Sequence, residues 1–65
     1  MSRERDFLIY CMERYRYSKG LTGAEAAKLF DRYDIYGYIN KYYEVLHVIS
    51  DQLIVEDIDK YINSI

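Results

Sequence analysis

The sequence has little of the chemistry that stabilises a small protein. Among 65 residues it contains one cysteine and one histidine, and no proline or tryptophan. A single cysteine excludes an internal disulfide, and a structural zinc site needs about four cysteine or histidine ligands, more than Cys11 and His47 supply. A domain of this length buries only about 60% of the surface that its unfolded chain exposes. We therefore expect one small domain, residues 1–65, and we expect association with another chain to add to its stability.

Long apolar runs are also missing. No stretch approaches the ~18 apolar residues that mark a membrane span. Residues Met1–Asp6 are mostly charged, and no apolar signal-peptide segment follows them. The unpaired cysteine fits a reducing compartment. The sequence therefore predicts a cytoplasmic location and no association with a membrane.

Charge of one sign is not in excess, because the net charge is only -2. A global field that would attract nucleic-acid phosphates is therefore excluded. Charged residues make up 31% of the chain and hydrophobic ones 51%, which is typical of a globular domain and not of a disordered one. Basic residues dominate positions 1–20 and acidic ones positions 51–65. We expect these two ends to attract each other.

The apolar spacing predicts a mainly α fold, a compact bundle of about four helices. Residues 3–19 carry apolar side chains at three- and four-residue steps, and Gly20 stands where a C-terminal glycine cap belongs. Thr22 and Glu25 form a capping-box pair that begins a second helix. That helix is expected to end near residues 33–34.

The sequence pattern in the second half of the chain is less regular. A third helix is expected over Ile35–Leu46, although Gly37 costs about 1 kcal/mol there relative to alanine. Residues 47–55 are mostly β-branched around a polar centre, which favours a short β-hairpin or an extended loop. Acidic residues then mark the first turn of a last helix, which is expected to begin near Glu56.

Candidate catalytic and metal-binding residues are few, and each has a structural explanation. His47 lies between apolar neighbours and is expected to be partly buried, with a backbone carbonyl as its partner. Cys11 lies on the apolar arc of the first helix, where a buried thiol is expected. The carboxylates of Glu56, Asp57 and Asp59 lack the spacing of a calcium loop. We therefore expect no enzyme, no cofactor and no metal.

Tyrosine is the residue type in excess, with nine in 65 residues, five of them between positions 33 and 43. A tyrosine combines a large ring with a polar tip, which suits a surface that docks onto another protein. Three are assigned to the core: Tyr33, Tyr38 and Tyr42. Four fall outside the core arcs and are the candidate partner-binding residues: Tyr36 with Tyr43, and Tyr10 with Tyr17.

A DNA-binding helix-turn-helix is an alternative, because the second and third helices are joined by a short turn. A recognition helix presents arginine, lysine, asparagine or glutamine to DNA. The third helix offers Asn40 and Lys41 next to Glu44, and tyrosine rings beside them. This composition disfavours nucleic acid as the partner.

Several segments together carry a family resemblance that spans nearly the whole chain. They are FLIYCMERY at Phe7–Tyr15, Leu21–Gly23, Leu29–Phe30, Tyr33, Tyr38–Ile39, Tyr43, Leu46–His47, Glu56–Asp59 and Tyr61–Ile62. Through them the chain resembles a family of short bacterial proteins known only as a domain of unknown function. The family pattern often has threonine after the Leu-His pair and glycine in the next turn, where this chain has Val48 and Ser50–Asp51.

The resemblance implies a role, because members of that family are commonly encoded beside a protein that looks like an ADP-ribosyltransferase. Such a pair suggests a toxin and its antitoxin. The first hypothesis is therefore a non-catalytic protein-binding module that binds and neutralises an ADP-ribosyltransferase-like enzyme. The alternatives are a small helix-turn-helix DNA-binding regulator and a self-associating structural subunit, for instance a homodimer.

Overall fold

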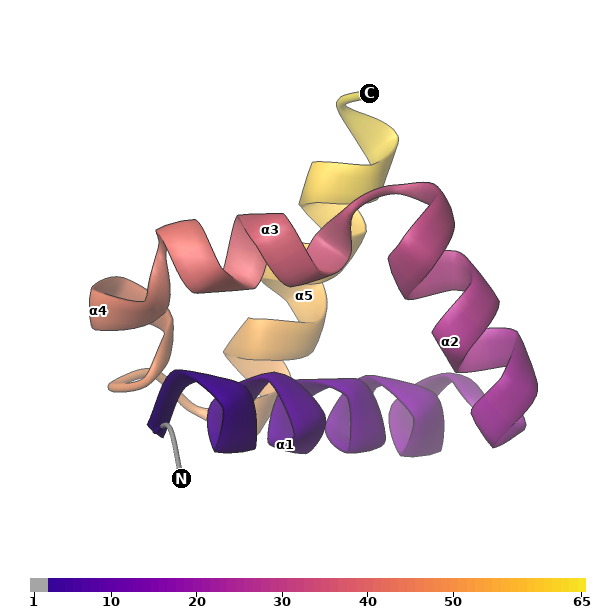
Figure 1. Cartoon of the computed structure of the whole chain (residues 1–65), viewed down its shortest axis with the longest axis horizontal. Coiled ribbons are helices and arrows are strands. Elements are labelled where there is room, and N and C mark those ends of the chain that lie inside the picture. Colours follow the sequence, from indigo (N-terminus) through magenta and orange to yellow (C-terminus); the bar gives the residue numbers. More distant parts are fainter. Residues whose placement is uncertain (1–2) are drawn as a thin grey trace.

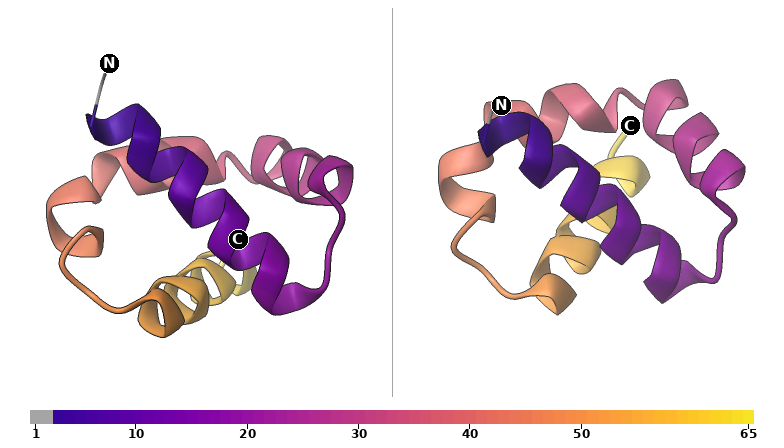
Figure 2. Two further views of the ribbon diagram at one scale, coloured as in Figure 1. Left: turned by 90° about the horizontal axis from the view of Figure 1, so that it is seen from below. Right: turned by 60° about the horizontal axis from the view of Figure 1, so that its bottom comes forward.

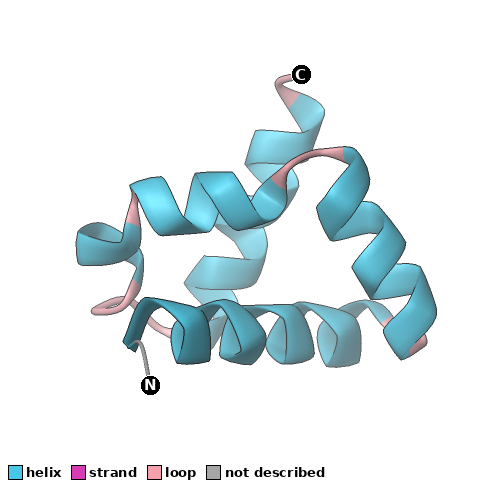
Figure 3. Cartoon of the chain, viewed as in Figure 1, coloured by secondary structure: helices cyan, strands magenta, loops and turns pink. Residues whose placement is uncertain are grey.

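In the computed structural model, residues 3–65 form five helices joined by short loops, and no strand occurs among them (Figures 1 and 3). The helices are α1 (Arg3–Lys19), α2 (Gly23–Arg32), α3 (Ile35–Lys41), α4 (Tyr43–Leu46) and α5 (Asp51–Asn63). The prediction of a mainly α fold is confirmed, with five helices in place of about four. Met1 and Ser2, which begin the charged N-terminal stretch, lie outside the described residues.

Helix α1 ends as the sequence predicts. Gly20 adopts a left-handed conformation with φ 66°, which costs a glycine little. Its N–H donates to the Tyr17 carbonyl at 3.3 Å, and the Leu21 N–H donates to the Arg16 carbonyl at 3.0 Å. These two bonds form a Schellman motif, which satisfies carbonyls that the helix end would otherwise leave unpaired.

The capping box of α2 is also confirmed. The Glu25 N–H donates to Thr22 Oγ1 at 3.1 Å, and the Thr22 N–H donates to Glu25 Oε1 at 2.8 Å. This second bond holds the pKa of the Glu25 carboxyl below its usual value. The start of α2 is therefore fixed locally.

A sharp turn at Asp34 separates α2 from α3. Asp34 has a positive φ of 50° and accepts the Gly37 N–H through its side chain at 3.3 Å. A Cβ added at Gly37 would lie 2.5 Å from Asp34 Oδ2. Glycine is thus needed at this position so that the Asp34 carboxylate can fold over the start of α3, which explains a residue that is unfavourable in a helix.

The prediction of one helix over Ile35–Leu46 is wrong in one respect. The chain leaves α3 at Tyr42, whose φ of -107° and ψ of 25° interrupt the helix, and α4 continues as a single turn in a new direction (Figure 1). The new direction buries Leu46 and leaves Val45 exposed. Neither proline nor glycine marks the break, so no local signal in the sequence predicts it.

The expected hairpin or extended segment over residues 47–55 is also wrong. Ser50 is the N-cap of α5, and its hydroxyl accepts the Leu53 N–H at 3.3 Å. Only residues 47–50 form a loop, and α5 begins five residues earlier than predicted. The β-branched Ile54, Val55 and Ile58 lie at helical spacing on one buried face, and this packing outweighs their weak preference for strands.

The core lies where α1, α2, α3 and α5 meet. In the right-hand view of Figure 2, α5 crosses behind α1, α3 lies above them and α2 to the right, and α4 with the loop before α5 lies to the left. Eight side chains are almost completely buried: Cys11, Ala26, Phe30, Ile35, Ile39, Leu46, Ile54 and Ile58. Tyr15 also belongs to this core, whereas Tyr33, Tyr36, Tyr38 and Tyr61 are partly buried and pack around it.

Candidate protein-binding surface

One flank of α1 carries a line of aromatic and basic side chains. Phe7, Tyr10, Arg14 and Tyr17 follow one another at steps of three, four and three residues, which places them on one side of a helix. The rings of Phe7 and Tyr10 stack with centroids 6.3 Å apart. The Arg14 guanidinium lies 5.9 Å from the Tyr10 centroid and 5.8 Å from that of Tyr17. Arg14 therefore joins two tyrosines seven residues apart.

Helix α4 extends this line beyond α1. Tyr43 meets Phe7 edge to face, with centroids 5.4 Å apart, and stacks on His47 at 4.6 Å with nearly parallel rings. The His47 Nδ1–H donates to the Tyr43 carbonyl at 2.8 Å, which holds the imidazole against the ring. We call the six residues the aromatic strip: Phe7, Tyr10, Arg14, Tyr17, Tyr43 and His47.

The strip is exposed along much of its length and is fixed from one side by α5. Tyr17 is 75% exposed and Tyr10 44%, whereas Phe7 and Tyr43 are half-buried. The Tyr10 hydroxyl donates to the Asp51 carboxylate, which raises the pKa of Tyr10. Arg14 lies 3.9 Å from the same carboxylate. The expected attraction between the basic start and the acidic end of the chain is thus realised at this point.

The structure divides the four candidate tyrosines. Tyr10, Tyr17 and Tyr43 belong to the strip, although Tyr43 was expected to pair with Tyr36. Tyr36 instead packs against the core, edge to face with Phe30 at 5.4 Å, and its hydroxyl points at the Met12 sulfur at 3.5 Å. The expectation that Tyr36 forms an exposed pair with Tyr43 is therefore wrong, because α3 turns its ring inward.

Another group of tyrosines uses its hydroxyls inside the molecule. Tyr15 donates to Asp59 at 2.7 Å, Tyr61 donates to the Tyr33 carbonyl at 2.7 Å, and Tyr38 donates to Asp57. All three bonds link α5 to the rest of the domain. We call Tyr15, Tyr38 and Tyr61 the inner tyrosines.

Two of the inner tyrosines, Tyr15 and Tyr38, have a raised pKa. Burial raises the pKa of each far above the ordinary value, and the hydrogen bond to an aspartate raises it further. Lys19 also pairs with Asp59, at 2.5 Å, and its ammonium lies 5.8 Å from the Tyr15 centroid. Asp57 and Asp59 therefore attach α5 to its neighbours, whereas the sequence predicted only that they mark the first turn of the last helix.

The assignment of Tyr42 to the core is wrong. Tyr42 is 42% exposed, because the chain leaves α3 at this residue. Its ring lies 5.1 Å from that of Tyr38, which in turn stacks on Tyr61 at 4.1 Å. Tyr33 and Tyr38 do pack against the core, as expected.

The prediction for Cys11 is confirmed, and the prediction for His47 is confirmed only in part. Cys11 is completely buried, as predicted, and burial raises the pKa of its thiol to about 12, which keeps it protonated and unreactive. His47 has the expected carbonyl partner, but its side chain is exposed and not partly buried. It contributes an aromatic ring to the strip.

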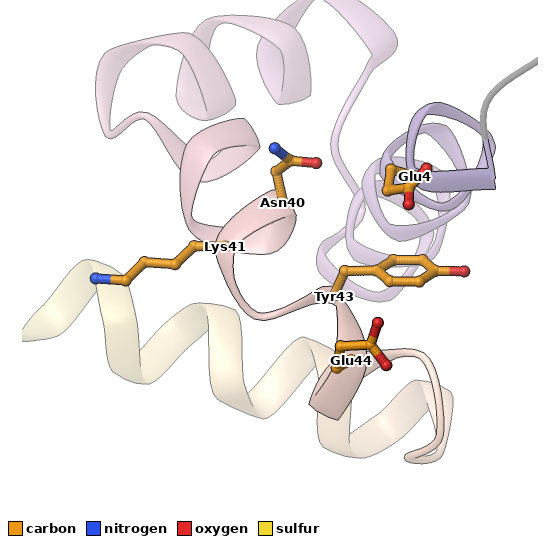
Figure 4. Close-up of a pocket in the computed structure, with 5 residues that line it drawn as sticks. All are labelled: Glu4, Asn40, Lys41, Tyr43 and Glu44. Carbon is orange, nitrogen blue, oxygen red and sulfur yellow. The ribbon is translucent and has the colours of Figure 1, made fainter.

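Two hollows border the strip. A shallow groove of about 380 Å³ lies between α1 and α5, and Tyr17, Val55 and Glu56 are among its lining residues. A pocket of about 470 Å³ lies at the other end of the strip, between the start of α1 and the α3–α4 junction (Figure 4). It is lined by Glu4, Asn40, Lys41, Tyr43 and Glu44.

Part of the strip could have been found in the sequence. The steps of three and four residues from Phe7 to Tyr17 place the four α1 members on one flank, and the ring-binding role of Arg14 is consistent with that spacing. The connection from Phe7 to Tyr43 depends on how α4 packs, and no local pattern predicts it.

The described part of the chain shows neither a metal cluster nor a membrane helix. Within residues 3–65 no three histidine, cysteine, aspartate or glutamate side chains are grouped as metal ligands would be. No helix in that range is long and apolar enough to cross a membrane.

The fold and the strip define a small all-helical domain with an aromatic surface on its first helix. The chain belongs to the family described as "Protein of unknown function (DUF3791)", whose model matches residues 6–64. This confirms the resemblance to a family of unknown function, whereas the neighbouring ADP-ribosyltransferase-like enzyme stays a prediction. No curated protein and no solved structure gives a significant match.

Proposed function

We propose that this chain is a non-catalytic protein-binding module, an antitoxin-like partner that binds and neutralises an ADP-ribosyltransferase-like enzyme. The observation that supports the proposal is the aromatic strip, which combines exposed tyrosines with an arginine. Tyrosine and arginine are enriched among the residues that supply most of the binding energy in protein interfaces. The choice of enzyme rests on the family resemblance.

The strip has a second property that favours binding, which is that its side chains are already held in place. Arg14 contacts the rings of both Tyr10 and Tyr17, and Asp51 binds both Arg14 and Tyr10. Ordering a side chain at an interface costs about 0.5–1.5 kcal/mol. A strip whose members are ordered before binding avoids much of this cost. It therefore suits tight binding to one surface.

Neutralisation in this proposal follows from steric cover. The strip runs along α1 and continues onto α4 (Figure 1), so a partner that covers it contacts two helices at once. Residues 7–17 of a helix span about 15 Å, which is compatible with an interface of standard size once flanking residues are included. In this proposal Tyr10, Tyr17 and Tyr43 are buried against the enzyme, and the bound domain blocks access to its substrate site.

Co-expression tests this proposal. The chain is produced together with the ADP-ribosyltransferase-like protein encoded beside it, and the mixture is separated by size-exclusion chromatography. We expect one complex, and we expect ADP-ribosylation by the enzyme to fall in proportion to the amount of chain added. Two separately eluting proteins, or a complex with undiminished activity, would contradict the proposal.

The isolated chain provides the control for the alternatives. A self-associating structural subunit would elute as a dimer or larger species without the enzyme. A DNA-binding regulator would be retained on heparin at low salt and released as salt rises. The proposal expects a species that flows through heparin and changes its elution only when the enzyme is present.

A further inference from the structure

The aromatic strip differs between its middle and its two ends in the hydrogen bonds that its side chains already make. Phe7 and Tyr10 form the middle, where their rings stack with centroids 6.3 Å apart. The Phe7 side chain has no polar atom, and the Tyr10 hydroxyl donates to the Asp51 carboxylate within the chain. The middle of the strip therefore needs no hydrogen bond from a protein that covers it.

The end of the strip at Tyr17 has donors that the chain itself does not satisfy. The Arg14 guanidinium lies 3.9 Å from the Asp51 carboxylate, farther than the about 2.7–3.2 Å of an N–H···O hydrogen bond. The Tyr17 hydroxyl has no hydrogen-bond partner among residues 3–65, and Tyr17 is 75% exposed. In the free chain these donors therefore bind water.

The end of the strip at Tyr43 also has polar atoms that other side chains leave open. The Tyr43 hydroxyl has no hydrogen-bond partner in the described part of the chain, and in Figure 4 it points away from Lys41. The His47 imidazole donates through Nδ1–H to the Tyr43 carbonyl, so Nε2 of the neutral ring is an acceptor. Because the His47 side chain is exposed, a partner can reach this nitrogen.

These differences restrict which surface can cover the strip. A polar group that loses its water on binding and receives no hydrogen bond in return weakens the complex. A group that is satisfied within its own chain carries no such cost. An apolar centre inside a polar rim is also the usual layout of a protein interface.

We propose that the strip fits a partner surface with an apolar side chain over its middle and hydrogen-bonding groups over its two ends. Arginine only donates, so the group that covers Arg14 and Tyr17 is an acceptor oxygen of a carboxylate or a backbone carbonyl. The group that covers His47 is an N–H or O–H donor, because Nε2 accepts. This inference deepens the proposed function and rests on it, because the partner surface belongs to the enzyme.

A tyrosine-to-phenylalanine scan tests the pattern, because each change removes one hydroxyl and keeps the ring. Calorimetric titration measures the Kd of the proposed partner enzyme for the unmodified chain and for each variant. We expect Tyr17→Phe and Tyr43→Phe each to raise Kd about fivefold, as the loss of one hydrogen bond across an interface does. Tyr10→Phe should raise Kd less than either, because the Tyr10 hydroxyl is bonded within the chain.

Tyr42→Phe is the matched control. It removes a hydroxyl from a ring outside the strip that is 42% exposed, and its Kd should equal that of the unmodified chain. Circular dichroism checks that each variant stays helical. An unchanged or lower Kd for either Tyr17→Phe or Tyr43→Phe, or the largest rise for Tyr10→Phe, would overturn the proposal.

The titration of the unmodified chain separates this inference from the proposed function. If the unmodified chain does not bind the enzyme, the antitoxin-like role is wrong and the inference falls with it. If the unmodified chain binds and the Tyr17→Phe and Tyr43→Phe variants bind equally well, the hydrogen-bonding pattern is wrong and the role stands. The result that we expect is binding that weakens most when a hydroxyl at either end of the strip is removed.

Discussion

Tyr15 and Tyr17 lie two residues apart on α1 and have opposite roles. Tyr15 is 4% exposed, packs against Phe30 at 5.9 Å and donates to Asp59. Tyr17 is 75% exposed, and its ring contacts the Arg14 guanidinium. One residue type therefore serves two purposes, decided by which side of the helix it occupies. The inner tyrosines hold α5 in place, whereas those of the strip are available to a partner.

The largest expected effect is that of Tyr15→Ala. Removing a buried ring costs about 3–5 kcal/mol, and a 65-residue domain has a total stability of about 3–10 kcal/mol. We expect the variant to be largely unfolded at 25 °C or to unfold at far lower urea concentration, as followed by circular dichroism. A loss below about 1 kcal/mol would show that Tyr15 is not part of the core.

The second largest effect is expected from alkaline pH, which should lower the free energy of unfolding. The pKa values of Tyr15 and Tyr38 are raised in the folded chain, so their protons stabilise it. This contribution is fully present below about pH 10, the pKa of an unfolded tyrosine, and is lost as the pH rises through the folded values.

Urea unfolding at pH 8 and in steps above pH 10 measures this loss. The folded chain should also form tyrosinate, detected by its absorbance, at higher pH than the urea-unfolded chain does. A free energy of unfolding that stays constant above pH 10 would contradict the inner role of these hydroxyls.

A smaller effect is expected from Tyr38→Phe, which keeps the ring stacked on Tyr61 and removes the bond to Asp57. A hydrogen bond of this kind contributes about 1 kcal/mol. The matched change in the strip is Tyr10→Phe, which removes the bond to Asp51 on an exposed surface. Chemical denaturation should show a clear loss in the free energy of unfolding for Tyr38→Phe and a smaller loss for Tyr10→Phe. The reverse order would contradict the distinction between the inner tyrosines and those of the strip.

The smallest effect on stability is expected from Tyr17→Ala. Exposed substitutions of this kind usually change the free energy of unfolding by less than about 0.5 kcal/mol. The urea midpoint should therefore stay close to that of the unmodified chain. A shift as large as that of Tyr38→Phe would mean that Tyr17 supports the fold, and the strip would lose Tyr17 as a docking residue.

The parts of the fold that could be predicted are those that depend on local chemistry. The Gly20 cap and the capping box of Thr22 and Glu25 follow from bonds within a few residues, and both were predicted correctly. The break at Tyr42 and the early start of α5 depend on burying Leu46 and Ile54 in the shared core. Tertiary packing decides these features, so local propensity predicted them wrongly.

The candidate site shows the same division. Helical spacing correctly separated Tyr10 and Tyr17 from the core face of α1. It failed for Tyr36, whose ring α3 turns toward Phe30 and Met12, and for Tyr42, where the chain leaves α3. Arg14 and Phe7 were not predicted to belong to this surface, although their helical spacing from Tyr10 and Tyr17 is present in the sequence.

The most direct measurement of the central claim is calorimetric titration of the proposed partner, an ADP-ribosyltransferase-like enzyme, with two variants of this chain. The double variant Tyr10→Ala with Tyr17→Ala removes two exposed rings of the strip, and Tyr42→Ala removes a ring of similar exposure to Tyr10 outside it, 42% against 44%. We expect the double variant to raise Kd about 30-fold or more, as loss of an interface anchor does, and Tyr42→Ala to change it by less than about threefold. Equal Kd values for the double variant and the unmodified chain, or a larger loss for Tyr42→Ala, would contradict the claim that the aromatic strip is the docking surface.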